Sequence, residues 1–425
     1  MIKSSSIGFW LFTGMLIVFF VLPDPAGLQK PFRIFLGLSF AAIYFSMLIK
    51  GELSTKTLIP ICLGGFAILL SILHGTLQIP LINSYLCLIG LLCLPHLFFD
   101  LTPVRKTNLT YIFILAILSM LIQFLIIRTP DGRPSLTYQI NTAGAYLFLF
   151  FIFSDVIQNK YGKLFVIALS LLILSRLLVF SILIFYLVRY FKSYFKIILE
   201  KINAVTIILL GYLCIIFFSL WYTVNMKPEL IDNPKISRLS EFNDESNKGR
   251  FRANTIFLMA FYNDPLNKNL LLGFGPAEQY IRQSRSAFMM IHNELFDAIS
   301  QFGLITVLIF SLFSLPLFNK VTTYANLEYI IPLLFYTLLL WVRYLIIPSF
   351  EMIFILFLLH ITNQKSSPFD SAQGPVGGAD CKSAPAGNIG PPLRTHLHPS
   401  KQGHLNYRGF VIHARNENKV STNHH

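Results

Sequence analysis

Apolar runs long enough to cross a lipid bilayer recur along most of this chain, from Ile7 to Thr362. A helix satisfies its own backbone hydrogen bonds in lipid, whereas a membrane barrel would alternate polar and apolar residues. Because each crossing needs about 20 helical residues, the sequence predicts an all-α fold, a polytopic transmembrane helical bundle with about 11–12 spans. The predicted spans are 7–22, 32–49, 57–74, 81–99, 109–127, 140–157, 164–175, 177–189, 202–224, 295–318, 327–342 and 344–362.

Composition supports a membrane location and argues against nucleic acid as a partner. Apolar residues make up 54% of the chain and charged residues 13%, whereas charged residues are about a quarter of a typical soluble protein. The formal net charge is +14. Its basic residues are spread over short connections between spans, where membrane proteins carry their topological signal. We therefore expect membrane lipids as a partner and no nucleic acid.

The distribution of basic residues predicts the orientation of the bundle. With the N-terminus in the cytoplasm, the inner connections before the tail hold 12 Lys and Arg residues, and the short outer connections hold 6. The positive-inside rule favours this arrangement. The single long connection, residues 225–294, then faces outward.

The apolar run from Leu164 to Val188 is interrupted only by Arg176. One helix would hold this arginine at mid-membrane, but both flanks of the run are basic and so favour the same side of the membrane. We therefore predict two short helices that enter and leave on the cytoplasmic side. Arg176 would lie at the turn between them, facing a water-filled cavity that opens outward.

The predicted organisation has four parts. Residues 1–224 form the N-terminal part of the transmembrane bundle, 225–294 a long outer loop with amphipathic helices, and 295–363 the C-terminal spans. Residues 364–425 are rich in Ser, Gly, Pro and Ala. Such a segment cannot bury enough apolar surface to offset the cost of ordering, so we predict a disordered tail.

Within the outer loop, the sequence predicts an amphipathic helix from about Arg250 to Tyr262, whose apolar face can lie on the membrane or on the bundle. Arg250 and Arg252 follow Gly249 at the start of this helix. They are candidates for binding an anion, because a helix N-terminus adds a positive partial charge. The GFGP sequence that begins at Gly273 lacks the third glycine and the strand of a dinucleotide-binding motif.

The stretch IHNELFDAISQFGLI at 291–305 places polar residues at the start of an apolar helix. Asn293 can cap that helix, and Glu294 and Asp297 complement its dipole. His292 is not explained by capping, and a histidine at the edge of a bundle can accept a proton from a hydroxyl. No second ligand stands at metal-binding spacing, so we expect neither a metal nor another cofactor.

Four stretches carry a resemblance to a known family: GRPSLTYQINTAGAYLF at 132–148, LSRLLVF at 174–180, KGRFRAN to LLGFGP across 248–276, and HNELFDAISQFGL at 292–304. In their order around one long outer loop, they resemble the O-antigen ligase and polymerase superfamily of bacterial envelope glycosyltransferases. One departure is the segment QINTAG, which lacks the proline usual between two asparagines. A site role for Asn141 is therefore not carried over.

The resemblance implies a multi-helix fold of the GT-C type, with the long loop in the periplasm and the bundle in the bacterial inner membrane. It implies an undecaprenyl-diphosphate-linked glycan as donor, and a lipid-linked repeat unit or the lipid A core as acceptor. It also implies a chain-length regulator and a flippase as partners. By the resemblance, His292 is catalytic and Arg176 and Arg250 bind the lipid diphosphate; the secondary candidates are Arg252, Arg133, Asn293 and Glu294.

Several functions fit these residues. We expect a polymerase rather than a ligase, and a protein O-oligosaccharyltransferase is a further alternative. A flippase or other transporter of lipid-linked oligosaccharide belongs to a different class, and it should show repeat symmetry and broken helices in matching halves. A structural scaffold would leave Arg176 without an explanation.

Overall fold

The computed structural model describes the parts of the chain that build a helical bundle. The described residues are 4–23, 29–128, 135–137, 140–173, 175–194, 203–225, 254, 257–258, 261–262, 264, 266, 268–273, 293–322, 326–339 and 344–365. The chain divides into two compact units, Met1–Ala372 and Gln373–His425. Every described residue belongs to the first unit, so the predicted tail beyond residue 365 lies outside the described residues.

The described part of the chain is helical, and none of its residues lies in a β-strand. The helices are α1 (Ser4–Leu16, continued by a π-helical turn at Ile17–Val21), α2 (Gln29–Ile49), α3 (Leu58–Leu73, after a 3-10 turn at Thr55–Thr57), α4 (Ile79–Leu97), α5 (Pro103–Ile126), α6 (Ile140–Val156), α7 (Lys160–Ile173), α8 (Arg176–Phe191), α10 (Ala204–Asn225), α13 (Lys268–Leu272), α15 (Glu294–Phe302), α16 (Leu304–Val321), α17 (Leu327–Leu339) and α18 (Phe350–Lys365).

Six of these helical segments are long and apolar enough to cross a membrane: Ser4–Val21, Gln29–Ile49, Thr55–Leu73, Ile79–Leu97, Pro103–Ile126 and Leu304–Val321. Shorter apolar helices lie at Thr142–Val156, Val205–Phe218, Leu327–Leu339 and Phe350–Gln364. The prediction of an all-α bundle is confirmed for the described residues, and several of its helices are long and apolar enough to cross a membrane.

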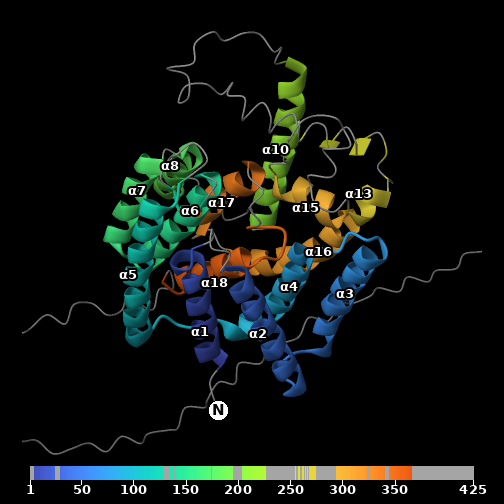
Figure 1. The fold of residues 1–425 in the computed structure, drawn as a ribbon, viewed down its shortest axis with the longest axis horizontal. Coiled ribbons are helices and arrows are strands. Elements are labelled where there is room, and N and C mark those ends of the chain that lie inside the picture. The colour runs from blue at the N-terminus through green and yellow to red at the C-terminus, as the bar shows by residue number, and fades with distance from the viewer. Residues whose placement is uncertain are drawn as a thin grey trace, which may run out of the picture. The chain divides into compact units, whose positions relative to one another are not determined.

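Helix α1 lies between two groups of helices and packs along α5 (Figure 1). Figure 1 shows α5, α6, α7 and α8 together at one side of the bundle, with α2, α3 and α4 on the other side of α1. Near the start of α1, Arg105 at the start of α5 donates to Ser5 (3.5 Å). At the far end of the π-helical turn that follows α1, Ser119 on the second half of α5 donates to the carbonyl of Val21 (2.6 Å). Helices α1 and α5 therefore run side by side.

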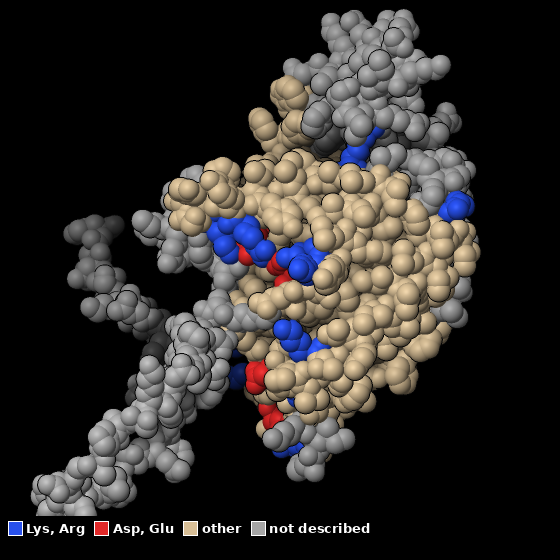
Figure 2. Space-filling view, turned by 90° about the vertical axis from the view of Figure 1, so that its left-hand side faces the viewer, with Lys and Arg blue, Asp and Glu red and all other residues tan. Residues whose placement is uncertain are grey.

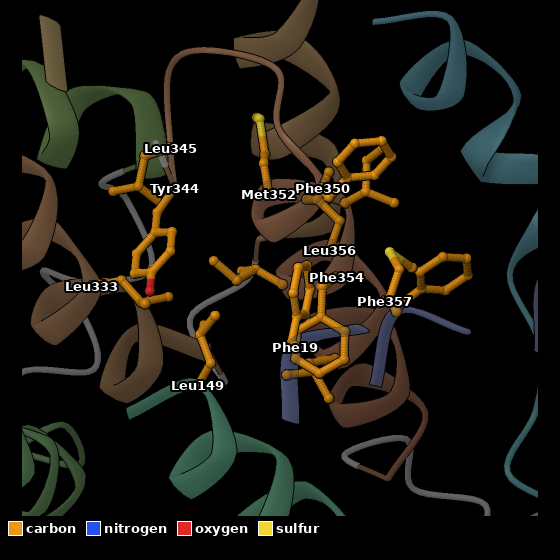
Figure 3. Close-up of a cluster of buried hydrophobic side chains, with 14 of the residues drawn as sticks. Phe19, Leu149, Leu333, Tyr344, Leu345, Phe350, Met352, Phe354, Leu356 and Phe357 are labelled. Carbon is orange, nitrogen blue, oxygen red and sulfur yellow. The ribbon is translucent and has the colours of Figure 1, made fainter. Parts of the chain in front are cut away.

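Aromatic rings fill the centre of the bundle and hold α18 inside it. The rings of Phe12 and Phe354 stack at 5.1 Å, and those of Phe113 and Phe150 stack at 4.9 Å. Figure 3 shows Phe350, Phe354 and Phe357 projecting from α18 into a cluster of buried apolar side chains. Such a helix, buried on nearly all sides, fits the high apolar content of its sequence.

Exposed apolar side chains are abundant on the outside of the bundle. Leu118 and Leu125 on α5 and Leu183 on α8 are more than half exposed. Figure 2 shows that charged side chains on one face gather into a few mixed patches, surrounded by uncharged residues. This surface fits a lipid environment, because a soluble protein rarely exposes large contiguous apolar patches.

Two predicted spans differ from the observed helices. The predicted span 295–318 is broken at Gly303, whose φ of 84° and ψ of 154° end α15 before α16 begins. The predicted span 344–362 becomes helical only at Phe350, and residues 344–349 form a loop before it. Apolar periodicity did not reveal either break, because Gly303 and the loop at 344–349 both lie within long, largely apolar runs of sequence.

Candidate functional site

The apolar run around Arg176 forms two helices. Helix α7 ends at Ile173 and α8 begins at Arg176. The hydroxyl of Ser175 caps α8 by accepting a hydrogen bond from the backbone N–H of Leu178 (3.4 Å). The prediction of a helix break at Arg176 is confirmed. The partly buried Arg176 side chain thus starts from the first turn of a helix, where the helix dipole favours anions.

Contacts with α17 show at which end of the bundle Arg176 lies. Beyond the last turn of α8, Lys192 donates to both carboxylate oxygens of Glu328 (2.9 and 2.8 Å) at the start of α17. Near the start of α8, the ring of Phe180 contacts that of Phe335 on the second half of α17 (5.3 Å). The two helices are therefore antiparallel, and Arg176 lies near the C-terminal end of α17.

Asn293 is fixed near the same end of α17. Its side-chain oxygen accepts hydrogen bonds from the backbone N–H groups of Leu295 (3.0 Å) and Phe296 (3.2 Å), which confirms it as the cap of α15. Its amide nitrogen donates to the carbonyl of Leu338 (3.4 Å), close to the last residue of α17. The starts of α8 and α15 therefore both meet the C-terminal end of α17.

Glu294 is fully buried and binds the loop between α17 and α18. Its carboxylate accepts backbone hydrogen bonds from Leu345 (3.4 Å), Ile346 (3.0 Å) and Ile347 (2.9 Å). Three amides around one carboxylate satisfy most of its hydrogen-bonding capacity. This part of the bundle, where the starts of α8 and α15 meet the end of α17, is called the Glu294 end below.

The first two sequence stretches of the resemblance meet at the Glu294 end. A Cβ atom on Gly144 of α6 would lie 2.6 Å from the Ser175 hydroxyl oxygen, so α6 and the start of α8 pack closely there. The hydroxyl of Tyr336 on α17 donates to the carbonyl of Gly144 (3.2 Å). The stretches 132–148 and 174–180 are therefore in contact, although a helix separates them in sequence.

The other two stretches also meet, through a pair of glycines. Gly273 after α13 has φ of 97°, and a Cβ there would lie 2.5 Å from the carbonyl oxygen of Gln301. A Cβ on Gly303 would overlap the backbone of Leu271 and Leu272. Only glycine allows this approach of two backbones, so the stretches 248–276 and 292–304 are in contact.

Part of the predicted amphipathic helix at 250–262 packs on the bundle. The ring of Phe257 stacks on that of Phe296 in α15, with centroids 5.0 Å apart. Asn254, one turn earlier, is buried, and its side-chain oxygen has no hydrogen-bond partner. The sequence did not single out Asn254, because an asparagine on an amphipathic segment carries no distinctive signal. Tyr262 is exposed.

No protein-family model matches this chain, and no curated protein matches it either. The resemblance therefore depends on the four stretches themselves, and the structure adds that residues from each of them meet at neighbouring helix ends.

The other sequence-predicted site residues are His292, Arg250, Arg252 and Arg133, and all lie outside the described residues. Their assigned roles stay predictions. Within the described ranges, no three His, Cys, Asp or Glu side chains gather in a group that could hold a metal ion. The described site consists of one arginine at a helix start, a capped helix start, and a carboxylate held by backbone amides.

Proposed function

We propose that this protein is a membrane glycosyltransferase that transfers or polymerises a glycan carried on a lipid diphosphate. The observation that carries the proposal is that the stretches 132–148, 174–180 and 292–304 meet at the Glu294 end, while the stretch 248–276 packs on α15 through Phe257 and Gly273. Helix packing brings distant stretches together in any bundle, but packing alone gives no reason for an arginine to lie among them. A common binding site explains both their separation in sequence and their proximity in space.

Arg176 is the proposed ligand of the lipid diphosphate. A guanidinium group binds phosphate oxygens in a bidentate manner, and the N-terminus of α8 adds the partial charge of its free N–H groups. As the bond to the sugar breaks, negative charge grows on the leaving diphosphate, and a fixed cation stabilises it. On sequence grounds Arg250 supplies a second cation, with Arg252 and Arg133 as secondary candidates.

His292 is the proposed general base. It directly precedes Asn293, whose three hydrogen bonds fix the start of α15. In the proposed reaction the acceptor hydroxyl loses its proton to His292, its oxygen forms a bond to the anomeric carbon, and the bond from that carbon to the diphosphate breaks. The configuration inverts, and undecaprenyl diphosphate leaves. The lipid diphosphate already stores the energy, so the scheme uses neither a nucleotide nor a metal.

Glu294 is better assigned a positioning role than a role in binding substrate. Its carboxylate is buried and occupied by three backbone amides, which hold the loop at 344–349 against the start of α15. A group that binds the substrate would need free acceptor capacity.

The proposed location is the bacterial inner membrane with about 11–12 spans, the N-terminus in the cytoplasm and the loop 225–294 in the periplasm. The excess of basic residues in the connections on the proposed inner side supports this orientation. Reporter fusions in residues 225–290 test it directly. A cytoplasmic signal from these fusions contradicts the whole proposal, because lipid-linked repeat units are joined on the outer face.

Substitutions at His292 and Arg176 test the chemistry. We expect His292→Ala to lower kcat by about 100- to 10,000-fold, and Arg176→Ala to lower kcat/KM by about 100- to 1,000-fold. Arg176→Lys should recover only part of the loss, because lysine lacks the planar fork. Arg128→Ala is the matched control, since Arg128 is exposed and its hydrogen bonds to described residues go to carbonyls of its own helix end.

The assay is transfer from a purified lipid-diphosphate glycan, together with glycan analysis of a deletion strain. Loss of long chains with one repeat unit still attached to the core indicates a polymerase. Loss of every attached unit with lipid-linked polymer accumulating indicates a ligase, and loss of glycan from a protein indicates an O-oligosaccharyltransferase. Normal transfer by His292→Ala at wild-type protein level refutes the catalytic role.

One observation favours a transporter as the second candidate. The α7–α8 pair is a broken membrane helix, and broken helices line the substrate sites of many secondary transporters. A transporter of lipid-linked oligosaccharide would move its substrate between leaflets in proteoliposomes without joining glycans. Arg176→Ala would then abolish movement, whereas His292→Ala would leave it unchanged.

A further inference from the structure

A buried carboxylate joins the start of α7 to the end of α8. Asp155, near the end of α6, accepts a hydrogen bond from the Lys163 amine at the start of α7 (2.9 Å). Both terminal nitrogens of Arg189, near the end of α8, donate to the same carboxylate. The hydroxyl of Tyr329 on α17 donates to its second oxygen (2.7 Å). One side chain therefore binds the entry of the pair, its exit and a neighbouring helix.

A second carboxylate extends this cluster along α17. Glu328 lies 2.8 Å from the Lys192 amine and 3.5 Å from the Arg189 guanidinium. The Arg189 guanidinium also lies over the ring of Phe185, 4.4 Å from its centroid. Both carboxylates are almost completely buried. Removing one partner of such a pair is costly, because it leaves an uncompensated charge in a medium of low dielectric constant.

The contacts between the two ends of α8 are mainly apolar. Its buried positions include Leu178, Ile182 and Phe185, and they pack against α6 and α17. Apolar contacts have no preferred direction, whereas a hydrogen bond depends on the angle as well as the distance between its atoms. We therefore expect the polar ends of α8 to contribute most to its position along its axis.

Arg176 and Arg189 are 13 residues apart on one continuous helix, a separation of about 20 Å. A helix of this length moves as a rigid rod, so the hydrogen bonds at one end determine the height of the side chain at the other. Lys163 provides the same control over α7. The helix break is thus held at a fixed depth from the opposite end of the bundle.

We propose that Asp155 is a positioning residue for Arg176. Asp155 binds the start of α7 and the end of α8. It thereby holds the helix break between them at the depth at which the Arg176 guanidinium meets its anionic ligand. The ligand assignment depends on the proposed function, but the mechanical part of the proposal does not. Asp155 lies at the opposite end of α6 from Gly144, so it does not contact the site itself and acts on Arg176 through the helices that it joins.

The test uses the full-length protein in lipid nanodiscs and the variant Asp155→Asn. A misplacement of about 1 Å can cost about 100-fold in rate, so we expect kcat/KM for transfer from the lipid-diphosphate glycan to fall by at least about tenfold. Asp155→Glu should restore most of it. Asp100→Asn is the matched control, because Asp100 accepts a hydrogen bond from Gln364 and neither α7 nor α8 contributes to that bond.

The deciding kinetic readout is the double variant with Arg176→Ala. If Asp155 acts through Arg176, adding Asp155→Asn to Arg176→Ala lowers kcat/KM no further, whereas independent effects multiply. Multiplying effects overturn the proposal. If the Asp155→Asn variant does not accumulate, Tyr329→Phe removes one hydrogen bond from the same carboxylate and should show the same pattern at smaller amplitude.

A second readout does not depend on activity. Spin labels on the exposed positions Leu118 of α5 and Leu183 of α8 report the placement of α8, in a chain whose Cys62, Cys214 and Cys381 are serine. A slip of one residue moves α8 by about 1.5 Å along its axis. We expect Asp155→Asn to shift or broaden this distance distribution. If the wild type transfers no glycan, the proposed function fails, and the spin-label distance alone then tests whether Asp155 positions α8. A distance distribution that Asp155→Asn leaves unchanged refutes this positioning role.

Discussion

Replacing Gly303 by alanine should separate the described part of the outer loop from the bundle. Gly303 has φ of 84° and ψ of 154°, a region that only glycine occupies readily, and forcing another residue into it costs about 1–3 kcal/mol. The new Cβ would also overlap backbone atoms of Leu271 and Leu272, which belong to α13. Backbone cannot rotate away as a side chain does, so overpacking adds about 1–3 kcal/mol.

Together these contributions predict a loss of about 2–6 kcal/mol in the free energy of unfolding. Equilibrium unfolding in mixed micelles of a mild detergent and dodecyl sulfate measures this quantity. Gly51→Ala is the matched control: its φ of 72° is also positive, but a Cβ there meets nothing within 4 Å. Only the backbone cost of about 1–2 kcal/mol applies to it. If both variants lose the same stability, the close approach of α13 to the α15–α16 junction is refuted.

Three further changes test the hydrogen bonds of the bundle by the same unfolding measurement. Asn293→Ala should cost about 1–2 kcal/mol through loss of the helix cap. Asn293→Asp keeps the cap acceptor and loses only the donor to Leu338, so an equal loss of stability in the two variants would contradict the capping role. Glu294→Gln should cost about 1–3 kcal/mol, because its amide nitrogen would face backbone N–H groups; an unchanged stability would show that the loop is held otherwise. Glu351→Gln should cost about 3–5 kcal/mol, because it removes the carboxylate charge that lies 2.8 Å from the Arg33 guanidinium. Adding Arg33→Met should recover part of that loss, and a double variant weaker than the single one would contradict the ion pair.

The break at Arg176 illustrates what apolar patterning with charge predicts. A single arginine within 25 residues of apolar sequence, flanked by basic residues on both sides, allows few membrane arrangements. The sequence therefore predicted the pair of short helices, with ends close to those observed. The capping role of Asn293 was predictable for a similar reason, since a helix cap depends on neighbours two and three residues away.

The break at Gly303 and the cluster around Asp155 show where prediction from sequence fails. Gly303 interrupts an apolar segment only because its partner Gly273, thirty residues earlier, packs against the same turn. The partners of Asp155 come from α7, α8 and α17, and nothing local distinguishes this aspartate from one at an ordinary helix end. Glu294 has the position of a residue that complements a helix dipole, yet its ligands are amides some fifty residues later.

By itself the amino-acid sequence determined the helical class of this protein, the approximate bounds of most helices, and the turn that carries Arg176. These properties follow from hydrogen bonds within a helix and from the cost of burying charge in lipid, and both depend on residues close together in the chain. Only the tertiary structure decided which helix ends meet, that Glu294 binds the loop before α18, and that Asp155 binds residues of α7, α8 and α17. Those contacts join distant residues, because every buried polar group must find a partner wherever the packed helices provide one.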